Sequence, residues 1–187
     1  MGTISRNRIG FAIALGLGLL ITTFCIAAKK PQVSGTQAVQ NKTCGYYLRY
    51  PKGSQLDHPS DCVLKITPPS NLYPKWVSEL SLTLYTATLD QPALGQTPDG
   101  DPNAKPVGSI KGGGMTFQKT LYEDAAMSHR MITWVYEGRG KYRKYRFEGY
   151  LRGTVPEVMD LHVKDWDPDK FAEKTFDEMV ETFVPMK

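Results

Sequence analysis

Residues 131–151 read MITWVYEGRGKYRKYRFEGYL, and this stretch decides the class of fold. Met131 to Glu137 and Tyr142 to Leu151 are both rich in β-branched and aromatic residues. Gly138-Arg139-Gly140 separates the two runs. Two such runs around a short glycine-bearing loop are typical of a β-hairpin. The stretch therefore predicts two antiparallel strands.

The second arm of this hairpin has two chemically different faces. Side chains alternate along a strand, so Tyr145, Phe147 and Leu151 share one face, which we expect to be buried. The other face and the turn carry cations beside an aromatic ring, interrupted by Glu148. The residues that we expect to bind an anionic partner are Arg139, Lys141, Arg143, Lys144, Arg146, Tyr150 and Arg152.

Three kinds of partner suit such a surface: lipid headgroups, anionic glycans or an acidic protein patch. The alternative is a solvated strand face whose cations protect a sheet edge from aggregation. Nucleic acid is not expected, because the formal charge of +4 falls to +2 without Arg6 and Arg8.

Further strands are predicted before this hairpin, from alternating or aromatic runs that end at turn residues. They cover Gly45–Tyr50, Cys62–Ile66, Leu80–Tyr85 and Met115–Tyr122. Gly112-Gly113-Gly114 is interpreted as a bend between strands. Residues 70–79 are a candidate helix, and the proline-rich residues 89–106 are expected to form a long loop.

A helix is predicted near the C-terminus. Asp167 can cap it, and Pro168 suits its first turn. Phe176, Met179, Val180 and Phe183 follow i, i+3, i+4, i+7 spacing, which gives the helix one apolar stripe. The expected fold class is α+β, an antiparallel β-sheet with the C-terminal helix packed on one face. Residues 44–187 would form this single domain.

The N-terminal segment predicts export. Arg6 and Arg8 precede an uncharged, largely apolar run from Ile9 to Ala28. Residues 1–28 are therefore expected to be a signal peptide or a membrane anchor, and lipidation of Cys25 is a third reading. The polar residues 29–43 are expected to be a flexible tether. The expected location is extracytoplasmic, either periplasmic or secreted, with possible membrane association through residues 9–28.

Two cysteines remain outside this segment. Cys44 and Cys62 are an even pair in a chain that is expected to be exported, which favours a disulfide bond. The closed loop of about 18 residues would stabilise the fold by about 3 kcal/mol. The alternative is two unrelated thiols.

Motifs that would carry chemistry are weak. There is no G-x-S-x-G motif, and the adjacent Ser128 and His129 would point to opposite faces of a strand. Acidic runs at Asp99-x-Asp101-x-Asn103 and Asp165-x-Asp167-x-Asp169 lack the Glu that completes a calcium loop. Turn formation and helix capping explain them better. No enzyme activity, metal or cofactor is expected.

Short motifs along the chain are similar to those of a known family. These are Tyr50-Pro51-Lys52-Gly53, Gly114-Met115-Thr116-Phe117, Ala125-Ala126 with Tyr136, and Phe176-Asp177-Glu178-Met179-Val180-Glu181-Thr182-Phe183. Over residues 45–184 the chain resembles the PsbP-like and DcrB-like domains. The resemblance implies a central antiparallel sheet flanked by helices, in an exported and non-enzymatic accessory protein that binds partner proteins or sits near membranes.

The expected function is therefore a non-catalytic, exported accessory or binding protein of the cell envelope. Its partner would be an envelope protein or an anionic envelope surface. Two alternatives stay open. One is a secreted inhibitor or effector that docks a target protein through the hairpin or the 89–106 loop, and the other is a hydrolase with a non-standard site.

Overall fold

The computed structural model describes residues 35–73, 76–92, 94–95, 102–126, 129–154 and 168–187. Of these, 62% lie in strands and 13% in helices, with ten strands in two sheets and one C-terminal helix. The predicted α+β class is therefore wrong, because the described chain is a mostly antiparallel β protein. The predicted signal peptide or anchor over residues 1–28 lies outside the described residues.

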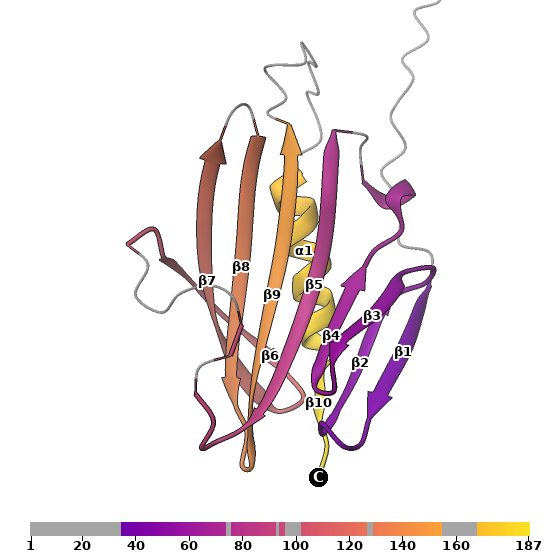
Figure 1. Ribbon diagram of the computed structural model, residues 1–187, viewed down its shortest axis with the longest axis vertical. Coiled ribbons are helices and arrows are strands. Elements are labelled where there is room, and N and C mark those ends of the chain that lie inside the picture. The colour runs from indigo at the N-terminus through magenta and orange to yellow at the C-terminus, as the bar shows by residue number, and fades with distance from the viewer. Residues whose placement is uncertain (1–34, 74–75, 93, 96–101, 127–128, 155–167) are drawn as a thin grey trace, which may run out of the picture. The chain divides into compact units, whose positions relative to one another are not determined.

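The larger sheet has seven strands, and each strand is antiparallel to its neighbours (Figure 1). In spatial order they are β3 (Gln55–Ser60), β4 (Val63–Thr67), β5 (Val77–Thr88), β9 (Arg143–Thr154), β8 (His129–Arg139), β7 (Met115–Ala126) and β6 (Lys105–Gly112). The predicted hairpin is confirmed as β8 and β9, which pair in register from His129 with Thr154 to Arg139 with Lys144. The hairpin lies near the centre of the sheet, so its face towards α1 forms the middle of the hydrophobic core.

The smaller sheet joins the two ends of the described chain. It consists of β1 (Thr36–Asn41), β2 (Tyr46–Pro51) and β10 (Val184–Pro185), with β2 in the middle. The predicted tether over residues 29–43 is wrong for Thr36–Asn41, because these residues pair with β2. Their polar side chains gave no strand pattern because β1 is an edge strand with mostly exposed residues.

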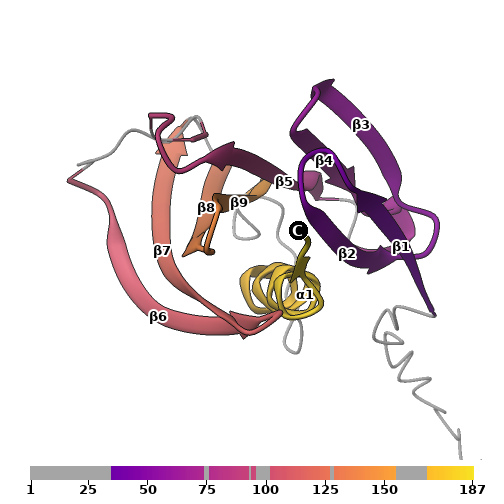
Figure 2. The same cartoon turned by 90° about the horizontal axis from the view of Figure 1, so that it is seen from below.

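Helix α1 (Pro168–Glu181) lies on the concave face of the larger sheet, which curls around it (Figure 2). The predicted apolar stripe is confirmed, since Phe176, Met179, Val180 and Phe183 are all at most 3% exposed. The stripe contacts β9, β6 and β2. Pro168 occupies the first turn, as expected, and the predicted cap at Asp167 lies outside the described residues.

Two glycine positions allow this close approach. A Cβ atom on Gly149 would lie 2.4 Å from the Phe176 ring, so a glycine in β9 lets the helix rest on the sheet. Gly113, with φ of +55°, turns the chain between β6 and β7, where a Cβ atom would meet the Phe183 carbonyl at 2.3 Å. The predicted bend at residues 112–114 is confirmed.

A disulfide bond joins the two sheets. Cys44 lies just before β2 and Cys62 just before β4, and their sulfur atoms are 2.05 Å apart. The predicted pairing is confirmed. The sequence separation of 18 residues corresponds to about 3 kcal/mol in the chain-entropy model.

Two local predictions need correction. Of the candidate helix over residues 70–79, the structure has one 3₁₀ turn at Ser70–Leu72 (η1), and β5 begins at Val77. The loop expected over 89–106 ends earlier, because β6 begins at Lys105. Within the described part of the chain, no helix is long and apolar enough to cross a membrane.

Candidate functional site

The turn between β8 and β9 brings four of the predicted cations to one end of the domain. We call Arg139, Lys141, Tyr142, Arg143 and Lys144 the hairpin end. Arg139 and Lys141 are exposed, and Tyr142 is 60% exposed, the most of the large hydrophobic side chains that are described. The Lys141 ammonium lies 5.1 Å from the centre of the Tyr142 ring. The turn therefore presents cations beside an exposed aromatic ring.

Two further cations of the hairpin end hold it against neighbouring segments. Arg143 Nη2 donates a hydrogen bond of 2.8 Å to the Thr43 carbonyl, and Lys144 Nζ donates to the Gln91 carbonyl. Both acceptors are neutral, so these bonds fix the side chains without cancelling their charge. Asp90 lies close enough to Lys144 to offset part of that charge. The hairpin end is held in place and stays cationic.

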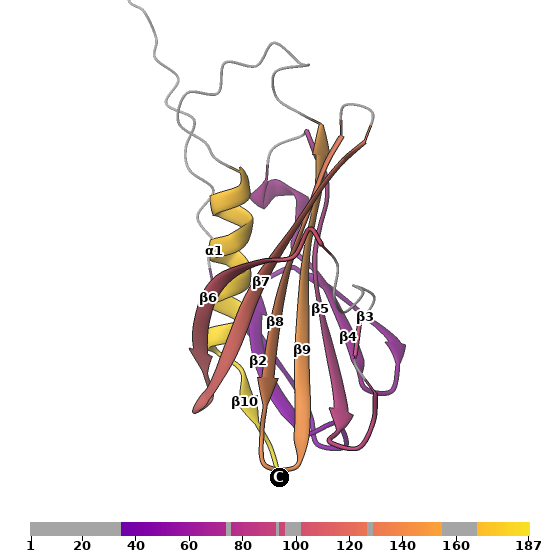
Figure 3. The same cartoon turned by 90° about the vertical axis from the view of Figure 1, so that its left-hand side faces the viewer.

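Two cations that the sequence did not single out lie near this end. Lys42 precedes Thr43, which accepts the bond from Arg143, and Lys187 follows Met186, whose amide donates to Gly45. Figure 3 shows β10 and the β8–β9 turn at the same end of the domain. This grouping depends on the pairing of β10 with β2, which is two residues long and leaves no pattern in the sequence.

Arg146 does not belong to a binding surface, and its prediction as a partner-binding residue is wrong. Its side chain is 3% exposed and pairs with Glu148 at 2.9 Å and Glu137 at 3.0 Å. Glu137 lies directly opposite Arg146 in the register of β8 and β9. Residues 94–95 pass over the pair, since a Cβ atom on Gly95 would lie 2.7 Å from Arg146 Nε. The cation is buried with Glu148, while Glu137 reaches it from the exposed side of the sheet.

Tyr150 and Arg152 lie on the same face of β9 but towards its other end. Arg152 is exposed and Tyr150 is partly buried. The buried pair of Arg146 and Glu148 separates them from the hairpin end. The seven predicted residues therefore do not form one continuous basic surface.

Tyr150 lies instead in a groove on the convex face of the larger sheet, away from α1. The groove has a volume of about 710 Å³ and extends across β3, β4, β5, β9 and β8. We call it the outer groove. Its polar lining includes Lys65, Ser81, Thr83, Tyr85, Glu148 and Tyr150. Strand alternation places these side chains together, because Ser81 faces Tyr150 and Thr83 faces Glu148 across β5 and β9.

The side chains at the floor of the outer groove are largely buried, and two of them bind to one another. Ser81 is 3% exposed and Glu148 is 8% exposed. The Tyr85 hydroxyl is hydrogen-bonded to Glu148, and burial, with the nearby Glu148 charge, raises the pKa of Tyr85 to about 12. At one side of the groove Lys65 pairs with Glu79 at 3.2 Å. Most of the charge in the groove is thus matched internally.

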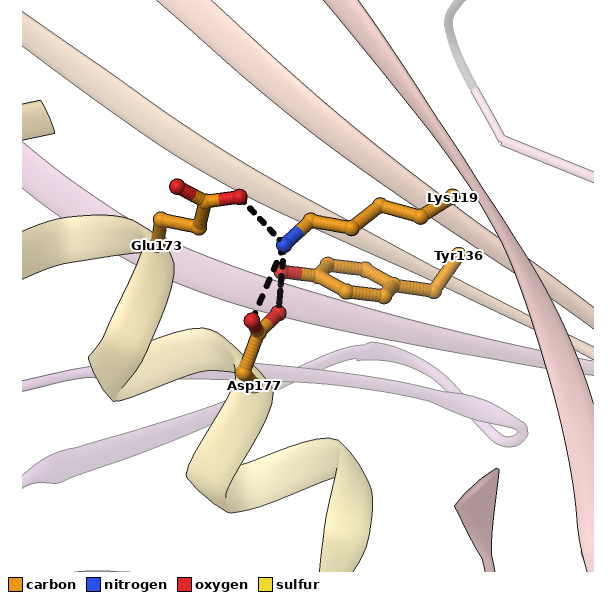
Figure 4. A network of polar contacts seen from close by, with 4 residues as sticks. All are labelled: Lys119, Tyr136, Glu173 and Asp177. Carbon is orange, nitrogen blue, oxygen red and sulfur yellow. Dashed lines mark hydrogen bonds and ion pairs between the residues drawn. The ribbon is translucent and has the colours of Figure 1, made fainter. Parts of the chain in front are cut away.

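A second polar cluster, partly buried, lies between the sheet and α1 (Figure 4). Lys119 of β7, 7% exposed, pairs with Glu173 at 2.6 Å and with Asp177 at 2.8 Å. Tyr136 of β8 donates a hydrogen bond of 2.7 Å to the same Asp177. Burial, followed by the Asp177 charge, raises the pKa of Tyr136. Each group has a partner within the cluster, so the arrangement fastens the helix to the sheet.

The acidic runs considered as metal sites from the sequence lie mostly outside the described residues. No group of three or more His, Cys, Asp or Glu side chains that could hold a metal ion is found among the described residues. Asp99, Asp101, Asp165 and Asp167 lie outside them, as does Ser128.

Comparison with known proteins finds distant structural similarities. No protein-family model and no curated protein matches the chain. A crystal structure of a protein from Bacteroides thetaiotaomicron VPI-5482 is similar with a TM-score of 0.48 and 10% sequence identity. The similarity covers 81% of this chain and 48% of that chain, so this chain spans about half the length of that protein. The resemblance to PsbP-like and DcrB-like domains stays a prediction.

Proposed function

We propose that this protein is an exported, non-catalytic binding protein of the cell envelope that attaches to an anionic membrane surface through the hairpin end. The observation that carries the proposal is the exposed turn that presents Arg139, Lys141 and an aromatic side chain, Tyr142, with Lys141 beside the ring. Arg146 is neutralised by the buried carboxylate of Glu148, whereas Arg139 and Lys141 lie at the exposed turn.

Tyr142 favours a lipid surface over an acidic protein patch. A tyrosine has an apolar ring and a polar hydroxyl, which suits the boundary between headgroups and acyl chains. Cations beside it are attracted to anionic headgroups. Val184, in the adjacent C-terminal strand, is 44% exposed and adds apolar surface near the same end.

Export is supported by two independent features. The disulfide bond between Cys44 and Cys62 is typical of proteins from oxidising compartments. The cationic and then apolar residues 1–28 have the composition of a signal peptide or membrane anchor. Both features agree with a protein that meets lipid headgroups outside the cytoplasm.

The expected attachment is reversible and sensitive to salt. Each Lys or Arg near an anionic surface contributes about 1 kcal/mol, and that attraction falls off within a Debye length. Four cations with one aromatic ring therefore give binding that is lost at high ionic strength.

The test is co-sedimentation of the domain, residues 31–187, with vesicles that contain phosphatidylglycerol, and with vesicles of phosphatidylcholine alone. We expect binding to the first kind only. The double variant Arg139→Glu/Lys141→Glu reverses two charges at the turn. It should weaken binding at least about tenfold, since two cations at about 1 kcal/mol each are lost and repulsion is added.

The matched control is Lys52→Glu/Arg152→Glu. It makes the same change in net charge at two exposed positions outside the hairpin end. Equal losses in the two double variants would mean that only net charge matters, and the proposed role of the hairpin end would be wrong. Capture of an envelope protein with no vesicle binding would favour the protein partner instead.

A further inference from the structure

We infer that the outer groove is a second binding site, and that its ligand is an uncharged, polyhydroxylated chain, an oligosaccharide. The groove shares no residue with the hairpin end, so this inference does not depend on the membrane proposal. It lies on the opposite face of the sheet from the core and has a volume of about 710 Å³.

The hydrogen-bonding groups of the groove come from neighbouring strands in register. Ser81 of β5, Tyr150 of β9 and Thr133 of β8 lie side by side across the sheet. Ser81 is nearly buried, so the hydroxyls open to a ligand are those of the partly exposed Thr133 and Tyr150, and each can both donate and accept a hydrogen bond. A sugar hydroxyl has the same two capacities, so a row of protein hydroxyls is complementary to it.

The charges of the groove argue against a strongly charged ligand. Lys65 is paired with Glu79, and Glu148 is paired with Arg146 beneath the groove. Asp57 of β3, which is exposed, adds one carboxylate to the lining. A carboxylate has oxygen lone pairs that accept hydrogen bonds, so the groove has acceptors for sugar hydroxyls and a small excess of negative charge, which disfavours an anionic ligand.

Two tyrosine rings supply the apolar part of the surface. Tyr85 and Tyr150 are both partly buried and line the groove at different points along β5 and β9. Partly exposed rings offer a flat apolar contact for the C–H groups of a sugar. The Tyr85 hydroxyl is hydrogen-bonded to Glu148, so the polar contact of this pair of rings comes from the Tyr150 hydroxyl.

The lining favours a chain over a single sugar. Glu79 and Tyr85 both line the groove and lie six residues apart on β5. At about 3.3 Å per residue the polar lining extends over about 20 Å. A linear oligosaccharide of several units matches this length.

The test is isothermal titration calorimetry of residues 31–187 with three uncharged linear probes, namely cellohexaose, maltohexaose and chitohexaose. We expect at least one to bind with a Kd below about 1 mM. Thr83→Trp, which fills the middle of the groove, should abolish that binding. Tyr150→Ala should weaken it about tenfold, through the loss of a ring contact and a hydroxyl.

The hairpin double variant Arg139→Glu/Lys141→Glu is the matched control and should bind the probe as the unchanged protein does. Near-ultraviolet circular dichroism establishes that each variant is folded. The inference is wrong if none of the three probes binds, or if folded Thr83→Trp binds as tightly as the unchanged protein.

Discussion

Arg146 shows how strongly one residue can depend on its partners. Its guanidinium is 3% exposed, and hydrogen bonds to Glu148 and Glu137 compensate for the loss of water. Glu148 is itself buried, at 8% exposed. Removal of the cation would leave a buried carboxylate without its main counter-charge, which is far more costly than the loss of a surface pair.

We predict that Arg146→Met lowers the free energy of unfolding by about 3–5 kcal/mol, the usual cost of breaking a buried ion pair. Urea denaturation followed by tryptophan fluorescence measures this loss. Arg139→Met, at an exposed position of the same hairpin, should change the free energy by less than about 0.5 kcal/mol. Similar values for both variants would contradict the buried pair.

The sequence could show only part of this residue's environment. Glu148 is two positions away on the same strand face, so its proximity was predictable. The position of Glu137 opposite Arg146 also follows from the pairing of the two hairpin strands. The covering residues 94–95 were not, because they come from a long connection whose course no local pattern sets. Arg146 was therefore interpreted as exposed.

At the scale of elements, the contact between α1 and β9 depends on Gly149. The helix can lie close to the sheet only because this position has no side chain facing Phe176. A methyl group there would overlap the ring, and the ring is completely buried among other core residues.

We predict that Gly149→Ala lowers the free energy of unfolding by about 1–3 kcal/mol, the usual cost of overpacking a core. Thermal and urea unfolding measure this effect. Phe176→Leu removes the clashing ring atoms, so the double variant should be less destabilised than the sum of the two single variants. Simple additivity would mean that the two positions do not clash.

The elements that the sequence predicted are those with a buried face. The β8–β9 hairpin, β5 and α1 each place apolar side chains at the period of a strand or a helix. The missed strands β1, β3 and β6 are edge strands with mostly exposed residues, and β3 and β6 contain Pro59 and Pro106. An edge strand needs no buried face of its own, so its sequence lacks alternation. These missed strands are why α+β was expected.

The two candidate binding surfaces also differ in how far a local sequence pattern reveals them. The hairpin end is continuous in sequence, and its cations were found from composition alone. The outer groove combines side chains from β3, β4, β5, β8 and β9, and only Tyr150 among its lining is predicted as a binding residue from the sequence. The register across these strands brings the others beside it, and that register is a property of the whole sheet.

At the scale of the whole molecule, buried tyrosines set a limit to stability at high pH. Burial raises the pKa of Tyr85 to about 12, and it raises the pKa of the fully buried Tyr136 as well. In the unfolded chain these phenols ionise near 10.0. Above that pH the unfolded state loses protons that the folded state keeps, so the free energy of unfolding falls as pH rises.

We predict stability that is unaffected by these tyrosines up to about pH 9 and that falls steeply above about pH 10. The urea midpoint at a series of pH values measures the decline. Tyr136→Phe removes one such phenol and should make the decline shallower by about 1.4 kcal/mol per pH unit, the linkage slope for one proton. An unchanged slope would show that Tyr136 ionises as readily folded as unfolded.

The pairing of β10 with β2 joins residues near the start of the described chain to residues near its end. Helix α1, which precedes β10, also supplies Phe176, Met179 and Val180 to the core, and Phe183 follows just after the helix. A chain threaded N-terminus first through a translocation pore would therefore lack a closed core until residues 168–187 had emerged. Under the proposed export, such a chain would stay unfolded for most of its passage and would fold once residues 168–187 had crossed.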